Sequence, residues 1–166
     1  KYDAVFASTG LHMGRSTRIP GTDHQHVYQA IELLHRITLG EEVHVAENIV
    51  VIRGGNVAMD ITRSLARLQK QKFGKVGIIT TSLETEDILP ADREEVDETR
   101  EENAVVMPGW APQRIEIENG EIRGLHVAQC LSLFDEEGNF NPQCNLENLN
   151  FFEGTMIVEA IGHCIV

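Results

Sequence analysis

The chain has 166 residues, of which 42% are hydrophobic and 24% are charged, and its formal net charge is −12 at pH 7. This composition fits one globular domain with a hydrophobic core, and it excludes a disordered chain or a coiled coil. The negative charge argues against a nucleic-acid partner, because phosphate binding draws on a basic surface. Since no apolar run approaches the roughly 20 residues of a membrane span and no secretory signal is present, we expect no membrane contact and a cytoplasmic location.

Two elements are expected in the first 40 residues. Residues 2–8 form a β-rich run that ends at Thr9 and Gly10. Residues 27–39 predict a helix, because apolar side chains recur at spacings of three and four residues. These side chains are Val27, Ala30, Ile31, Leu34 and Ile37.

The next segment reads NIVVIRGGNVAMD over residues 48–60, where a short apolar run meets two glycines and a helix begins. The run is apolar on both faces, as in a strand at the middle of a covered parallel sheet. A helix is predicted from Asn56 to about Gln71, and a second strand over residues 75–81. Together they predict two parallel neighbouring strands joined by a right-handed helical crossover.

The segment from residue 84 to 102 is strongly acidic, with ten acidic and two basic side chains. This pattern favours a solvent-exposed helix face over an acidic docking surface. Asp92, followed three residues later by Glu95, predicts a capping box at the start of that helix.

A β-rich region follows the acidic segment. Asn119-Gly120 predicts a hairpin turn that places Ile115 and Ile117 opposite Ile122 and Leu125. Residues 140–151 are rich in turn residues and are predicted to be a loop, and the GTMIVEAIG segment is predicted to contain a buried strand. The whole pattern predicts an α/β fold: a Rossmann-like three-layer domain with a central parallel sheet, helices on both of its faces, and a small antiparallel β-meander over about residues 110–135.

The glycine turn after the first parallel strand is a candidate phosphate site. In the GxGxxG/A fingerprint, the second glycine admits the pyrophosphate and the third small residue lets helix and strand pack closely. Gly55 and Ala58 occupy these two places, whereas Arg53 stands at the first. A side chain there costs about 1 kcal/mol or more if the turn needs a left-handed backbone. Alone, the turn is as consistent with a structural β-α connection as with a nucleotide site.

Other side chains predict no separate chemistry. The three cysteines, Cys130, Cys144 and Cys164, are too widely spaced for a disulfide framework, a CxxC pair or an iron–sulfur ligand set, so we expect buried reduced thiols. The seven histidines show no metal-binding spacing. No serine lies in a nucleophile-elbow motif. We therefore expect neither a metal site nor a catalytic nucleophile.

Several motifs occur in a familiar order: YDAVFASTG, IPG, VVIRGGNVAMD, LPADREEV and MIVEAIG. In this order the chain resembles the NAD(P)H-binding domain, with flanking FAD-domain strands, of the glutamate synthase small-subunit (beta chain) family of FAD/NAD(P)-dependent flavoprotein oxidoreductases. The resemblance implies two Rossmann-like domains, with the NAD(P)H-binding domain inserted in the FAD-binding domain. It also implies electron transfer from reduced nicotinamide to flavin and on to iron–sulfur clusters.

The resemblance implies a division of the chain into three parts. Residues 1–40 would be a remnant of an FAD-domain strand with a connecting segment and helix, residues 41–155 the NAD(P)H-binding domain, and residues 156–166 a strand returning toward the FAD domain. Implied partners are NAD(P)H and the remaining FAD and iron–sulfur domains of a longer protein, or a glutamate synthase-type large subunit. With most of the FAD domain absent, we expect no bound FAD, no turnover by this chain alone, and self-association through uncovered apolar surface.

The resemblance also implies a set of cofactor-binding residues at the phosphate turn, after the second parallel strand, in the AIG segment near the nicotinamide, and in the first FAD-domain strand. These are Arg53, Gly54, Gly55, Asn56, Val57, Ala58, Thr81, Ser82, Ala160, Ile161, Gly162, Thr9 and Gly10. Relatives carry an arginine pair where this chain has Thr81 and Ser82, so the choice between NADH and NADPH stays open. Two functions are expected: hydride delivery from NAD(P)H to FAD, or, as the alternative, a degenerate scaffold segment that binds no nucleotide.

Overall fold

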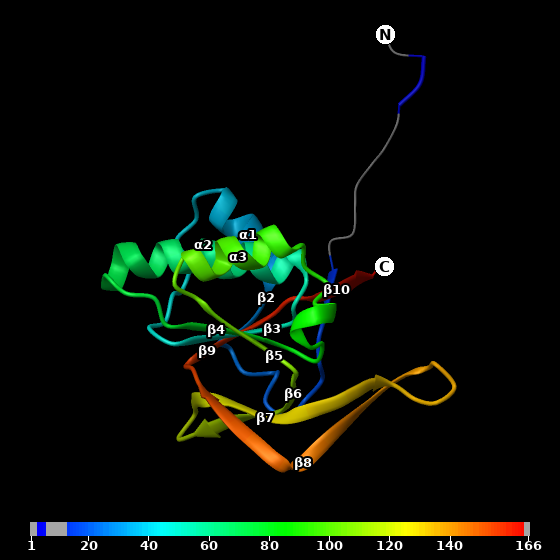
Figure 1. Ribbon diagram of the computed structural model, residues 1–166. Helices are drawn as coiled ribbons and strands as arrows, with labels where there is room; N and C mark the ends of the chain where they lie inside the picture. Colours follow the sequence, from blue (N-terminus) through cyan, green and yellow to red (C-terminus); the bar gives the residue numbers. More distant parts are fainter. Residues whose placement is uncertain (1–2, 6–12, 165–166) are drawn as a thin grey trace.

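The fold was analysed in a computed structural model that describes residues 3–5 and 13–164 of the chain (Figure 1). Its elements in chain order are β1 (Met13–Arg15), β2 (Val27–Gln29), α1 (Ala30–Thr38), β3 (Ile49–Ile52), α2 (Asn56–Phe73), β4 (Ile78–Ser82), the 3-10 helix η1 (Glu86–Ile88), α3 (Arg93–Glu101), β5 (Val105–Pro108), β6 (Trp110–Glu118), β7 (Glu121–Phe134), β8 (Phe140–Glu153), β9 (Met156–Glu159) and β10 (Ile161–Cys164).

A five-stranded parallel sheet in the order β2-β9-β3-β4-β5 forms the centre of the fold. All four residues of β3 are buried, because the strand has a neighbour on each side and a covering layer on each face. β3 and β4 are parallel partners, with Ile49 opposite Ile78, and α2 connects them. The predicted strand-helix-strand unit is therefore confirmed.

The two faces of the parallel sheet are covered by different kinds of structure. Ile49 and Val51 of β3 face a core shared with the helices, whereas Val50 and Ile52 face the antiparallel sheet β6-β7-β8. Figure 1 shows the three α-helices on one side of the parallel sheet and β6, β7 and β8 on the other. The prediction of three layers is confirmed, but the prediction of helices on both faces is wrong.

The second cover is antiparallel because that sheet has an apolar face of its own to bury. Alternate residues of its strands point to one side, and those directed toward the parallel sheet are apolar and buried. They are Ile115, Ile122, Leu125, Val127 and Phe152.

The predicted hairpin is confirmed. Asn119 (φ 54°) and Gly120 (φ 79°) both lie in the left-handed region, as a two-residue turn that matches strand twist requires. Ile115 pairs with Leu125 and Ile117 pairs with Ile122. The register shifts by one residue between these two pairs, at Glu116 and Ile117, so a β-bulge as well as the turn determines it.

The predicted loop over residues 140–151 is wrong, because this segment lies within the strand β8, which pairs along β7. β8 is an edge strand in the sheet order, so Pro142 does not interrupt a ladder on both sides. Pairing with β7 overrides the weak strand propensity of the asparagines.

The helix predicted over residues 27–39 begins three residues late. Val27 pairs with Ile157 in β2, so Val27 is part of the parallel sheet, and α1 starts at Ala30. The buried residues of α1 are Ala30 and Leu33, so the helix turns a somewhat different face to the core than the predicted stripe.

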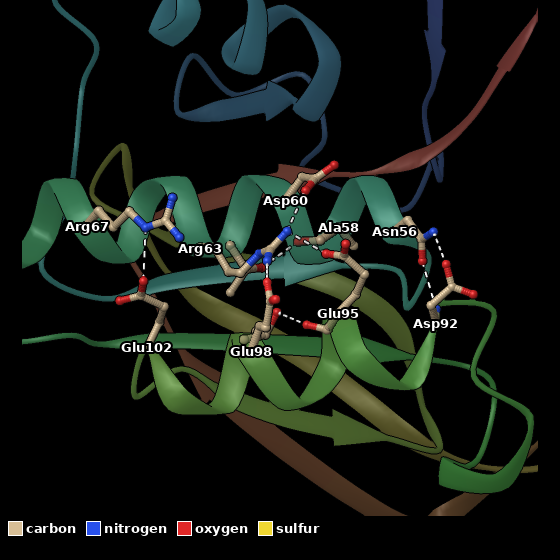
Figure 2. A network of polar contacts seen from close by, with 11 residues as sticks. Asn56, Ala58, Asp60, Arg63, Arg67, Asp92, Glu95, Glu98 and Glu102 are labelled. Atoms are coloured by element: carbon tan, nitrogen blue, oxygen red, sulfur yellow. Dashed lines mark hydrogen bonds and ion pairs between the residues drawn. The ribbon is translucent and has the colours of Figure 1, made fainter.

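Polar contacts join α2 to the acidic helix α3 (Figure 2). Arg63 of α2 forms ion pairs with Glu95 and Glu98 of α3 as well as with Asp60. Glu102, the residue that caps the end of α3, binds both Arg67 (2.9 Å) and Lys70 (2.7 Å). Most acidic side chains of the segment are exposed, as predicted, and some of them also pair with basic side chains of α2.

The predicted capping box at the start of α3 is wrong. Asp92 occupies the N-cap position, but its side chain makes no capping hydrogen bond. Instead its carboxylate accepts a hydrogen bond from Nδ2 of Asn56 (2.9 Å), and its backbone N–H donates to the side-chain Oδ1 of Asn56 (2.8 Å). Figure 2 shows this reciprocal pair, which ties the start of α2 to the start of α3. Glu95 is held by Arg63 and does not close the box.

A stack of histidines next to β2 makes stability depend on pH. The rings of His26 and His44 stack with centroids 4.6 Å apart. Partial burial lowers the pKa of His44 below its ordinary value of 6.5, and the nearby His26 and Lys72 lower it further. Because the folded state favours neutral His44, its contribution is complete above pH 6.5 and is lost as pH falls through the lower pKa of the folded state.

We expect the thermal midpoint to fall between about pH 7.5 and about pH 5.5, before most carboxylates titrate. His44→Phe keeps an aromatic ring for stacking and removes the titrating group, so its midpoint should change less over the same range. An equal fall in the variant would contradict the assignment to His44.

Candidate nucleotide-binding site

The candidate site lies at the carboxyl end of the parallel sheet, where β3 turns into α2. Gly55 is the N-cap residue of α2 and makes no side-chain capping bond. The first amides of a helix have no intrahelical acceptor, so they are available to an anion. An added Cβ at Gly55 would meet no atom within 4 Å, so the space beside the turn is open. Ala58 is fully buried, as close packing of the helix on the sheet requires.

Arg53, at the first position of the turn, adopts an unusual backbone conformation. Its φ is 120°, a value that side chains other than glycine rarely tolerate. Its guanidinium is directed toward Glu84, with Nη2 3.9 Å from Oε1. This separation is too long for a hydrogen bond, so little in this contact offsets the strain.

We expect Arg53→Gly to raise the free energy of unfolding by about 1 kcal/mol, because glycine adopts positive φ without steric cost. Arg53→Ala is the matched control, since it also removes the guanidinium but keeps the strain, and it should give no such gain. Urea unfolding of the two variants measures the difference. Equal stability of both variants would contradict strain at this position.

Gly54 lies in close contact with the segment after β4. A Cβ at this position would lie 2.6 Å from Leu89 Cδ2 and 2.9 Å from Ser82 Cβ. The Gly54 carbonyl also accepts a hydrogen bond from the Ala91 N–H (2.9 Å). The two glycines of the turn thus differ: packing requires glycine at position 54, whereas Gly55 faces open space.

Thr81 and Ser82 are the last two residues of β4, and both are buried. The Thr81 hydroxyl donates to the Trp110 carbonyl (3.1 Å), and the Ser82 hydroxyl donates to the Glu84 carbonyl (3.1 Å). Their hydroxyls are engaged within the protein, and their contact with a cofactor stays a prediction.

Glu84 was not among the predicted site residues, although it follows β4 and faces the turn. Its side chain is only 9% exposed. Within residues 3–5 and 13–164, its Oε2 atom is buried and has no hydrogen-bond partner. The sequence shows an acidic residue two positions after the strand, but only the fold shows that it is buried beside Arg53.

The AIG segment lies on the other side of the turn. The Ala160 N–H donates to the carbonyl of Ile52, the last residue of β3 (3.0 Å). Ala160 and Ile161 line a small depression together with Val57 of α2. The fold therefore brings predicted residues of two distant segments together. Gly162 lies in β10, which pairs with β1, and the predicted residues Thr9 and Gly10 lie outside the described residues.

Glu159, which precedes the AIG segment, is a second residue that the sequence reasoning missed. It is buried at the end of β9, yet its carboxylate is well satisfied. It accepts hydrogen bonds from the Thr17 N–H (2.8 Å), the Thr17 hydroxyl (2.5 Å) and the Gln29 amide (2.7 Å). Glu159 thereby holds the chain after β1 against the carboxyl end of the sheet.

Metal ligands and membrane-spanning helices are two further features to consider in the part of the chain that the structure describes. There, no three His, Cys, Asp or Glu side chains are grouped as a metal ion would require. In the same residues, no helix has the length and apolar character needed to cross a membrane. Cys130 and Cys144 are free thiols, of which Cys130 is buried and Cys144 half-buried.

Comparisons with known proteins agree with this architecture. The chain is 29% identical over 154 residues to the glutamate synthase [NADPH] small chain of Halomonas elongata, covering 86% of this chain and 31% of that protein. It is 29% identical over 165 residues to the NADP(+)-dependent formate dehydrogenase subunit beta of Moorella thermoacetica, covering 97% of this chain and 23% of that subunit. The chain thus spans less than a third of either relative. No family model matches it.

A solved structure has the same fold. Mycobacterium tuberculosis FprA in complex with NADPH superimposes with a TM-score of 0.72 at 14% identity, covering 96% of this chain and 50% of FprA. FprA therefore shares the fold of this chain, in which a parallel sheet is covered by helices and an antiparallel sheet. The chain is similar, at 29% and 24% identity, to the glutamate synthase [NADPH] small chains of Halomonas elongata and Azospirillum brasilense, and this similarity supports its resemblance to the NAD(P)-binding part of that family.

Proposed function

We propose that the chain is the NAD(P)H-binding module of a flavoprotein oxidoreductase and delivers hydride from NAD(P)H to an FAD held outside residues 13–164. The observation that carries this proposal is the open space at Gly55, beside the first amides of α2. A structural β-α turn does not require glycine at this position. The φ of −90° suits any residue, and an added Cβ would meet no atom within 4 Å. A pyrophosphate approaching the amides does need that space.

In this proposal each part of the site has one task. The amides of Asn56 and Val57 bind the pyrophosphate, helped by the positive end of the helix dipole. Ala160 and Ile161 lie on the opposite side of the turn and position the nicotinamide end. NAD(P)H, when bound, supplies the hydride. The protein binds and orients the nucleotide. We propose no nucleophile among the described residues.

We also propose the division of the chain into an FAD-domain remnant (residues 1–40), the NAD(P)H-binding domain (41–155) and a strand returning toward the FAD domain (156–166). The parallel sheet draws strands from all three predicted segments, since β2 and β9 flank β3. We propose the remaining FAD and iron–sulfur domains, or a glutamate synthase-type large subunit, as partners, and a cytoplasmic location. The purified chain should show no stoichiometric flavin absorbance.

Titration of NADH and NADPH by calorimetry tests the function. Gly55→Val fills the open space without a steric clash in the fold, so its effect on stability should be limited to about 1 kcal/mol from the poorer N-cap residue. It should weaken nucleotide binding by about tenfold or more, because the side chain occupies the path of the pyrophosphate. Gly55→Ala adds a single methyl group and should give an intermediate loss.

The alternative is a scaffold segment that binds no nucleotide, and the strained Arg53 in place of a glycine favours it. Absence of binding in both the unmodified chain and Arg53→Gly would support the scaffold. Binding that appears only in Arg53→Gly would show a site closed by this one side chain.

A further inference from the structure

The carboxylate of Glu84 lacks the hydrogen bonds that a buried charge normally has. Oε2 has no partner among the described residues, and Oε1 is 3.9 Å from Arg53 Nη2. A buried acceptor without a donor costs about 1–3 kcal/mol, and more when it is charged. A group that binds beside Glu84 and donates a hydrogen bond to Oε1 would therefore stabilise this carboxylate.

The position of Glu84 shows which part of a ligand that group would be. The Arg53 N–H donates to the Thr81 carbonyl (2.7 Å), so the glycine turn and the end of β4 lie side by side. When a dinucleotide pyrophosphate binds at such a turn, the adenosine ribose falls at the end of the neighbouring strand. Here that strand is β4, and the buried acid after it is Glu84.

We propose that Glu84 makes the chain select NADH over NADPH. Its carboxylate accepts a hydrogen bond from the 2′-hydroxyl of the adenosine ribose, and it repels the 2′-phosphate that distinguishes NADPH. Residues 81–92 contain no lysine or arginine that could bind this phosphate. The inference rests on the proposed nucleotide binding and adds the choice of nucleotide to it.

Arg53 has a positioning role in this selection. Its side chain is 38% exposed, and its guanidinium lies 3.9 Å from the Glu84 carboxylate, a separation that gives only a weak ion pair. A bound pyrophosphate offers the guanidinium a stronger, charge-assisted partner. As Arg53 turns to the pyrophosphate, the Glu84 carboxylate is uncovered for the ribose hydroxyl.

The test compares dissociation constants of NADH and NADPH for the unmodified chain and for Glu84→Gln. The unmodified chain should bind NADH at least about tenfold more tightly, and Glu84→Gln should bring the ratio close to one. Glu86→Gln is the matched control, because it removes the same charge two residues further along the chain. The Glu86 carboxylate already accepts hydrogen bonds from Arg100 (2.7 and 2.8 Å). The nucleotide ratio of this variant should remain that of the unmodified chain.

A measurement on the unmodified chain makes the test independent of how the variants fold. An NADH analogue that lacks the 2′-hydroxyl of its adenosine ribose should bind about tenfold more weakly than NADH. Equal binding of NADH and NADPH, a preference for NADPH, full affinity for the analogue, or the same shift in both glutamine variants would each overturn the inference alone. Failure to bind any nucleotide would overturn the proposed function, and the inference with it.

Discussion

Leu125→Ala should lower the free energy of unfolding by about 3 kcal/mol, because it opens a cavity between the two sheets. Leu125 of β7 is 0% exposed and belongs to the cluster that includes Val50 and Ile157 of the parallel sheet. Truncation therefore removes contacts within β7 and across the interface of the layers. Equilibrium unfolding in urea measures the loss.

Leu131→Ala is the control for this experiment, since Leu131 lies on the same strand but is 62% exposed. Its stability should stay within about 0.5 kcal/mol of the unmodified chain. Similar small losses in both variants would mean that the antiparallel sheet is not a layer of the core.

Gly54→Ala should destabilise the fold by about 1–3 kcal/mol, because the added methyl group has no space. Its Cβ would lie 2.6 Å from Leu89 Cδ2 and 2.9 Å from Ser82 Cβ. The Leu89 side chain can rotate away, whereas Ser82 is fixed in β4. The turn must then move away from the strand, and thermal or urea unfolding measures the cost.

Two further variants separate the causes of this effect. Gly55→Ala adds the same methyl group one residue later, in open space, and should cost less than about 1 kcal/mol, which is the effect of a poorer N-cap residue. Gly54→Ala combined with Leu89→Ala should regain only part of the loss that the methyl group causes, because the contact with Ser82 remains. Full recovery would assign the effect to Leu89 alone.

The strand-helix-strand unit around the glycine turn was predictable because its signals are local. β3 is a short apolar run, α2 carries an amphipathic stripe, and Gly74 ends α2 in a left-handed conformation. The hairpin at Asn119 was predictable for the same reason, since two residues determine its turn type.

The errors lie where distant contacts decide the structure. Nothing in the local sequence of β8 shows that β7 will pair with it along its length, so its asparagines read as a loop. Val27 fits a helical spacing, yet pairing with Ile157 places it in a strand. Whether a helix or a second sheet covers Val50 depends on residues far along the chain, from Ile115 to Phe152.

In the candidate site, too, local features were predictable from the sequence and features that depend on distant contacts were not. The motif located the turn from Arg53 to Ala58, and the later AIG segment, which meets Val57 in the fold. The sequence could not show the burial of Glu84, because that depends on how the segment after β4 folds back beside Arg53. For this reason the sequence alone left the choice between NADH and NADPH open.

The place of β9 in the parallel sheet affects how the protein is made. β9 lies between β2 and β3, although it follows every other strand of that sheet along the chain. During synthesis on the ribosome, β2 and β3 therefore wait with unpaired inner edges until Met156–Glu159 have emerged. Such edges pair readily with other strands, so the nascent chain is open to mispairing until this short segment closes the sheet.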